Sequence, residues 1–126
     1  MKNIDVFVIT GSCGVGKSTV SDELAKKYNL SVHINVDDIY NWYVGGYVKP
    51  WKDDGSRLNQ LKDNLSALVK NYAENNYTVV IDYVFFPDDI HQIVKGVKNI
   101  NVKYVVLMAD EDTIIKRDSY RGLLKK

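Results

Sequence analysis

The chain of 126 residues has the length of one small domain, and 45% of its residues are hydrophobic, which is enough for a single buried core. Its 17 basic and 16 acidic residues nearly cancel, which excludes the strongly basic surface of a general nucleic-acid-binding protein. The single cysteine excludes an internal disulfide. We expect a cytoplasmic protein with no membrane partner, because residues 1–10 are too short for a membrane span and lack a signal-peptide cleavage site.

Hydrophobic patterns predict strands and helices that alternate along the chain. Apolar runs predict strands over residues 5–10, 30–36, 77–86 and 102–108. Helical spacing of apolar residues predicts helices over residues 18–28, 56–75, 87–99 and 110–126. Residues 39–51 indicate a helical turn followed by an aromatic loop. Buried strands that alternate with helices predict a three-layer α/β/α domain with a mostly parallel sheet, whose ligands bind at the carboxyl ends of the strands.

A glycine-rich loop follows the first predicted strand. In the sequence GSCGVGKST, Gly11, Gly16, Lys17 and Ser18 match the pattern G-x-x-x-x-G-K-[ST] directly before a predicted helix. Glycines let several backbone N–H groups converge on one anion, and the helix N-terminus adds the positive end of its dipole. In such a loop the lysine reaches the β- and γ-phosphates, and the hydroxyl binds Mg²⁺. The predicted nucleotide-phosphate site comprises Gly11, Ser12, Cys13, Gly14, Val15, Gly16, Lys17, Ser18 and Thr19.

Carboxylates follow two of the other predicted strands. Asp82 interrupts the third apolar run, where it would hold Mg²⁺ through water in the manner of a Walker B aspartate, or form a solvated strand end or helix cap. Asp37 and Asp38 follow the second strand. One of them, and we favour Asp37, would accept the proton of an acceptor hydroxyl or touch the metal. The alternative for Asp37 is an N-cap for the turn that begins at Ile39.

Two further sets of residues have two interpretations each. Arg117 and Arg121 share a face of the last predicted helix, where they would clamp phosphates or stack on adenine, or else form a solvated basic face. Four aromatic residues would line an acceptor pocket or pack their loop onto the domain: Trp42, Tyr43, Tyr47 and Trp51. The two histidines have no cluster of other ligands at metal-binding spacing, so no zinc site is expected.

On these motifs the chain resembles the small P-loop kinases of the nucleoside-monophosphate-kinase-like group, such as shikimate kinase, gluconate kinase and chloramphenicol phosphotransferase. Within that group it looks most similar to the bacterial proteins called AAA-family ATPases. The resemblance rests on GSCGVGKS at 11–18, VDD at 36–38, VVID at 79–82 and KRDSYR at 116–121. It implies a parallel sheet in the order 2-3-1-4-5 and γ-phosphoryl transfer from Mg-ATP to a small hydroxyl or phosphate acceptor. It also implies Asp37 as acceptor ligand or base, and Arg117 or Arg121 in the lid or nucleotide site.

We therefore expect residues 1–126 to form one P-loop nucleotide-binding domain, C-terminally truncated because the fifth strand and last helix of the group are missing. Its expected activity is that of an ATP- and Mg²⁺-dependent kinase, in which Lys17 neutralises the transferring phosphoryl group. Its expected partners are a nucleotide and a small-molecule acceptor of unknown identity, with no nucleic acid. The alternative is a P-loop ATPase or nucleotide-binding module that acts as a switch with a protein partner.

Overall fold

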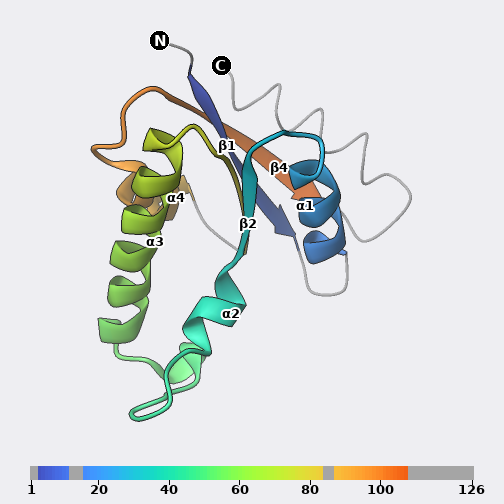
Figure 1. Cartoon of the computed structure of the whole chain (residues 1–126). Coiled ribbons are helices and arrows are strands. Elements are labelled where there is room, and N and C mark those ends of the chain that lie inside the picture. Colours follow the sequence, from blue (N-terminus) through green and yellow to red (C-terminus); the bar gives the residue numbers. More distant parts are fainter. Residues whose placement is uncertain (1–2, 12–15, 84–86, 108–126) are drawn as a thin grey trace.

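The computed structural model describes residues 3–11, 16–83 and 87–107, and its four strands form one parallel sheet in the order β2-β3-β1-β4 (Figure 1). The strands are β1 (Ile4–Gly11), β2 (Ser31–Asn35), β3 (Thr78–Asp82) and β4 (Ile100–Leu107). The predicted fold class is confirmed, and the order of these strands agrees with the first four positions of the implied order 2-3-1-4-5.

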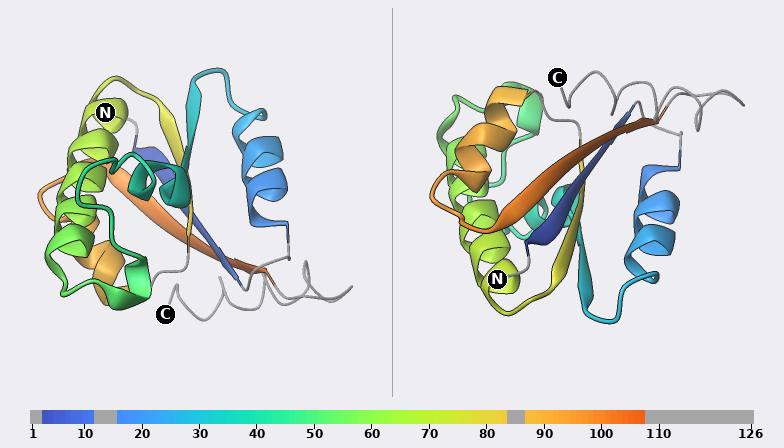
Figure 2. Two further views of the ribbon diagram at one scale, coloured as in Figure 1. Left: turned by 90° about the horizontal axis from the view of Figure 1, so that it is seen from below. Right: turned by 90° about the horizontal axis from the view of Figure 1, so that it is seen from above.

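Helices cover both faces of the sheet. The α-helices are α1 (Lys17–Ala25), α2 (Val36–Tyr40), α3 (Ser56–Glu74) and α4 (Pro87–Val94), and a 3₁₀ turn spans Pro50–Lys52. Helix α1 lies on one face, and α3 and α4 lie together on the other (Figure 2). None of the helices within the described ranges combines the length and apolar character that a membrane span needs. The last predicted helix, over residues 110–126, lies outside the described residues.

The sheet separates two hydrophobic cores, because successive side chains of a strand point to opposite faces. On β3, Val79 and Ile81 join the core beneath α3 and α4, whereas Val80 joins the core beneath α1. We call these two sides the α3 face and the α1 face. Asp82 follows the same alternation as Val80 and therefore belongs to the α1 face. Leu65 and Val69 bring α3 against the sheet at the four-residue spacing of an amphipathic helix.

The two aspartates after the second strand lie inside a helix and not at a strand end. Strand β2 stops at Asn35, and Asp37 and Asp38 form the first turn of α2. Asn35 is the N-cap, since its side-chain oxygen accepts a hydrogen bond from the Asp38 N–H at 3.2 Å. The capping role considered for Asp37 is therefore filled by Asn35. The charges of Asp37 and Asp38 favour the same helix start, because they face the positive end of its dipole.

Other predicted elements end earlier in the structure than in the sequence analysis. Helix α1 ends at Ala25 and not at residue 28, and β3 ends at Asp82. Helix α4 ends at Val94, before Gly96, whose φ of 82° places it in the left-handed region. A left-handed glycine just beyond the last turn is a common helix stop.

Candidate functional site

The start of α1 has the backbone geometry of an anion site. Gly16 precedes the helix with φ 82° and ψ 30°, a left-handed conformation that glycine adopts without a side-chain clash. Among the described residues no side chain caps α1, and its first turn contains no acidic residue. The N–H groups of that turn are therefore not neutralised by a carboxylate of the helix itself. Residues 12–15 of the predicted phosphate loop lie outside the described residues.

Lys17 and Ser18 open α1 beside the end of β1. The Lys17 ammonium donates to the Gly11 carbonyl at 3.1 Å, so the lysine side chain points back to the end of β1. The Ser18 hydroxyl accepts a hydrogen bond from the Asn35 amide at 3.0 Å. This contact joins the helix start to the carboxyl end of β2. Thr19, the last predicted residue of the phosphate site, is exposed on the first turn of α1.

Asp82 is buried at the carboxyl end of β3, with 4% of its surface exposed. That burial excludes the solvated strand end that the sequence left open. A buried carboxylate needs a polar partner, and here the partner is Nε2 of His33 on β2. The role of His33 as the partner of Asp82 was not predicted, because neither histidine has other ligands at metal-binding spacing in the sequence. The available signal was the alternation of β2, which places His33 and Asn35 on the same face of the strand.

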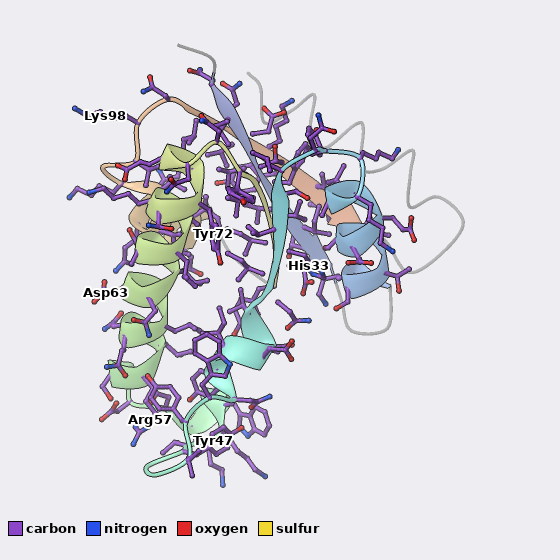
Figure 3. The ribbon with its side chains drawn as sticks, viewed as in Figure 1. His33, Tyr47, Arg57, Asp63, Tyr72 and Lys98 are labelled. Atoms are coloured by element: carbon purple, nitrogen blue, oxygen red, sulfur yellow. The ribbon has the colours of Figure 1, made fainter. Side chains whose placement is uncertain are left out.

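The His33 ring lies between the sheet and α1 (Figure 3). Its Nε2 contacts Asp82, and its Nδ1 is 3.9 Å from Oδ1 of Asp22 on α1. Asp22 is itself paired with Lys26 at 3.0 Å, and the hydrogen bond and charge of that lysine lower the pKa of Asp22. His33 thus connects a buried carboxylate of the sheet with the surface charges of α1.

Asp37 and Asp38 face different parts of the site. Burial and the nearby charges of Asp37 and Asp89 raise the pKa of Tyr83, which follows Asp82 in the chain. Asp37 lies two residues beyond Asn35, which pairs with Asp82, so it follows β2 beside the carboxyl end of β3. Asp38 instead lines an open groove of about 720 Å³ along β2, together with Ser18.

The aromatic residues after α2 fall into two groups. Trp42 and Tyr43 line a small hollow of about 240 Å³ between α2 and α3. The rest of this hollow is formed by Ile39, Gln60, Leu61 and Asn64. Tyr47 contacts Tyr40 edge to face, with ring centroids 5.8 Å apart, and Trp51 is 76% exposed. Of the four aromatic residues, Trp42 and Tyr43 therefore line this hollow, and Trp42 is at the same time 68% exposed.

Arg57 fixes the loop that carries these aromatic residues. Its guanidinium donates to Oδ1 of Asp53 at 3.2 Å and to the Gly46 carbonyl at 2.6 Å. The Tyr40 hydroxyl donates to the Val48 carbonyl at 2.5 Å. Figure 3 shows Arg57 and Tyr47 at the same end of the molecule, beyond α2. Arg57 therefore serves the structure of the loop. Arg117 and Arg121, the predicted nucleotide-site arginines, lie outside the described residues.

The oxygen donors of the site suit Mg²⁺. Ser18 and Asp82 offer a hydroxyl and a carboxylate, the ligands of a small hard cation that keeps several of its waters. Within residues 3–11, 16–83 and 87–107 no three His, Cys, Asp or Glu side chains gather closely enough to hold a metal by themselves.

A parallel sheet with a glycine loop between its central strand and a helix defines the class of P-loop nucleotide-binding proteins. The chain belongs to the AAA domain family, whose model matches residues 8–124. It is also similar to an adenylate kinase of Lactobacillus acidophilus, with 29% identity over 133 residues. That match covers 94% of this chain and 59% of the relative, so the chain spans less than two thirds of the length of that kinase.

Solved kinase structures share this fold. The APS kinase of Mycobacterium tuberculosis, in complex with AMPPNP and APS, matches with a TM-score of 0.59 and 17% identity over 100% of this chain and 74% of that one. A sugar kinase from a Janibacter species matches with a TM-score of 0.58 and 17% identity over 94% of this chain and 68% of its own. At such identities the likeness establishes the fold. The predicted resemblance to P-loop kinases is confirmed by the family match and the adenylate kinase relative.

Proposed function

We propose that the chain is a phosphotransferase that moves the γ-phosphoryl group of Mg-ATP to a hydroxyl or phosphate of a small molecule. The observation that carries the proposal is the placement of Lys17 and Ser18 at the start of α1, where the Ser18 hydroxyl contacts Asn35, the register partner of the buried Asp82. These residues supply what phosphoryl transfer requires of a protein, namely positive charge, metal ligands and fixed positions. The kinase names of the similar proteins support this choice of reaction.

In this proposal the α1 end of the sheet binds the nucleotide. The backbone N–H groups of residues 11–19 would hold the phosphates, and Lys17 would exchange the Gly11 carbonyl for phosphate oxygens. Ser18, and Asp82 through water, would hold Mg²⁺. The bound ion would neutralise phosphate charge. Arg117 and Arg121 complete the proposed nucleotide site.

The acceptor would bind between α2 and α3. Asp37 would take the proton of the attacking hydroxyl, a role supported by its place two residues beyond Asn35, the register partner of Asp82. The hollow lined by Trp42 and Tyr43 offers apolar walls, and the amides of Gln60 and Asn64 offer hydrogen bonds. This combination suits a small acceptor with both an apolar surface and polar groups.

Replacing Lys17 by alanine tests the proposal. We expect Lys17→Ala to lower ATP turnover by about 10²–10³-fold, because the transferring phosphoryl group loses a fixed positive charge. Lys27→Ala is the matched control, since Lys27 is an exposed lysine just after α1. Turnover would be measured with a panel of hydroxyl and phosphate acceptors, and folding by circular dichroism. A folded Lys17→Ala protein with parental turnover would overturn the proposal.

A second function, a nucleotide-dependent switch with a protein partner, is favoured by one observation. Trp42, Val44 and Trp51 lie on the same loop with 68%, 93% and 76% of their surfaces exposed. Grouped exposed hydrophobic residues often mark a contact surface. ATP hydrolysis that needs no acceptor would favour the switch, whereas turnover that depends on an acceptor would favour the kinase.

A further inference from the structure

Strand β2 is an edge strand of the described sheet, yet its end contacts the site at two points. It pairs only with β3 among the described strands. His33 and Asn35, two residues apart, share the α1 face. Each contacts a different residue of the proposed metal site: His33 contacts Asp82, and Asn35 contacts Ser18.

We propose that β2 supplies the positioning residues of this metal site, with His33 orienting the Asp82 carboxylate and Asn35 orienting the Ser18 hydroxyl. This inference rests on the proposed function and names residues that the phosphate-loop and Walker B patterns do not include. Neither residue is assigned as a ligand. Groups that hydrogen-bond to metal ligands fix the direction of those ligands and so influence metal affinity.

Because Asp82 is buried, its hydrogen bond with His33 has a strong influence on the orientation of the carboxylate. The Asp82 side chain is 5% exposed and the His33 side chain 19%, so bulk water gives the carboxylate little competing hydration. A hydrogen bond to a charged group in such surroundings restricts its rotation more strongly than one at the surface. Loss of the imidazole would leave Asp82 free to turn toward other donors. Asp82 would then be less often in the orientation that a hydrated Mg²⁺ requires.

Asn35 performs two tasks with the two ends of one amide. Its nitrogen donates to the Ser18 hydroxyl, and its oxygen accepts from the Asp38 N–H at the start of α2. The serine hydroxyl accepts this bond, which leaves its own hydrogen and a second lone pair for other partners. The amide therefore links the start of α1 with the start of α2, the helix of the proposed base.

The test measures how strongly Mg²⁺ enhances AMPPNP binding, by calorimetric titration at increasing Mg²⁺ from a metal-free start. We expect His33→Leu to raise the Mg²⁺ concentration for half-maximal enhancement by about 10–100-fold. Metal-free AMPPNP affinity should stay at the parental value, because the phosphate loop is untouched. His33→Gln should restore most of the Mg²⁺ response, since its amide nitrogen reaches the place of Nε2. His91→Leu, which alters an exposed histidine of α4, is the matched control.

The Asn35→Ser variant tests the contact between Asn35 and the Ser18 hydroxyl. Serine is a good N-cap, so α2 keeps its start, but its short side chain does not reach Ser18. We expect a weaker Mg²⁺ response with unchanged unfolding stability of the parent fold. A parental response in Asn35→Ser would remove Asn35 from the proposal.

The outcomes distinguish a failure of the proposed function from a failure of the positioning role of His33. If the parent shows no Mg²⁺-enhanced nucleotide binding, the proposed function and this inference both fail. If the parent responds and His33→Leu responds equally, only the positioning role fails. Equal losses of metal-free and Mg²⁺-dependent nucleotide binding in His33→Leu would show a purely structural role for His33 and would also overturn the positioning role.

If His33→Leu does not fold, the Mg²⁺ response of His33→Gln is compared with that of His33→Asn, whose side-chain nitrogen lies nearer the place of Nδ1. The positioning role requires the glutamine variant to respond at lower Mg²⁺, and equal responses overturn it.

Discussion

The α3 face of the sheet buries thirteen hydrophobic residues among those described, and the α1 face buries six. The buried polar residues of the described strands and helices are distributed the other way, whereas the Asp53 carboxylate is buried in the loop before α3. Ser21, Thr78 and Asp82 are all buried on the α1 face, Ser21 from the helix and the other two from β3. One face therefore consists of apolar packing, whereas the other places polar groups within a thinner core.

This difference indicates which face lowers the free energy of folding and which face contains groups that raise it. The hydroxyl of Ser21 is buried without a hydrogen-bond partner among the described residues, and Asp82 is a buried carboxylate. Both arrangements oppose folding, because each removes a polar group from water. Such local costs are expected beside functional sites. The apolar α3 face offsets them.

The largest expected effect concerns Asp37, which follows β2 on the α3 side of the sheet. A catalytic Asp37 would mean that the α3 side contributes to the reaction as well as to stability. We expect Asp37→Asn to lower turnover by about 10²–10⁴-fold, because an amide does not accept the proton of the acceptor hydroxyl. ATP affinity should change little, since the phosphate loop lies at α1. Steady-state kinetics with a responsive acceptor measures both quantities.

Asp38→Asn is the matched control for Asp37, because both aspartates are exposed in the first turn of the same helix. Loss of charge near the dipole of α2 is the same in the two variants, so only the chemical role differs. A parental rate in Asp37→Asn would return that residue to a purely helix-stabilising role. A slow Asp38→Asn with a normal Asp37→Asn would assign the base to Asp38.

Leucine truncation on each face sharpens the comparison. Leu65 of α3 is completely buried, and Leu65→Ala should cost about 2–5 kcal/mol of unfolding free energy through lost burial and a cavity. Leu24 of α1 is only partly buried against the smaller core, so Leu24→Ala should cost about 1–2 kcal/mol. Urea denaturation measures both. Equal losses would show that the two faces contribute alike to stability.

The local part of this architecture could be predicted from the sequence. The phosphate loop is a continuous pattern between a strand and a helix, and Asp82 interrupts an apolar run, so both were recognised without knowledge of the fold. The alternation of strands and helices likewise indicated the parallel sheet. Each of these features depends on neighbours within a few positions of the chain.

The contacts that complete the site depend on distant neighbours. His33 meets Asp82 across 49 positions of sequence, through the register that pairs Asn35 with Asp82. A register shift of one residue would turn His33 to the other face, and nothing in either strand alone fixes that register. The cap of α2 was misplaced for a different reason. Asn and Asp cap helices about equally well, and residues 35–38 contain three possible caps, namely Asn35, Asp37 and Asp38.

The smallest expected effect lies farthest from the α1 face, in the loop before α3. Burial raises the pKa of Asp53, but hydrogen bonds from the N–H groups of Leu58 and Gly55 and from Arg57 outweigh it and lower that pKa below 3.8. The folded pKa thus lies below the unfolded one. The ionised carboxylate therefore stabilises the fold above the unfolded value, and this stabilisation disappears as the pH falls through the folded value.

Asp53→Asn should accordingly flatten the acid side of the stability curve below about pH 5, measured by urea denaturation at each pH. The control is Asp63→Asn, which changes an exposed aspartate in the middle of α3 (Figure 3). Since Asp53 holds the loop through Arg57, its loss should loosen the acceptor side while metal-free nucleotide binding at the α1 face stays unchanged. Parent and Asp53→Asn curves of the same slope would show that this carboxylate does not couple protonation to folding. A loss of metal-free nucleotide binding in Asp53→Asn would show that the two faces are coupled through the sheet. The α1 face and the α3 face would then not be independent in function.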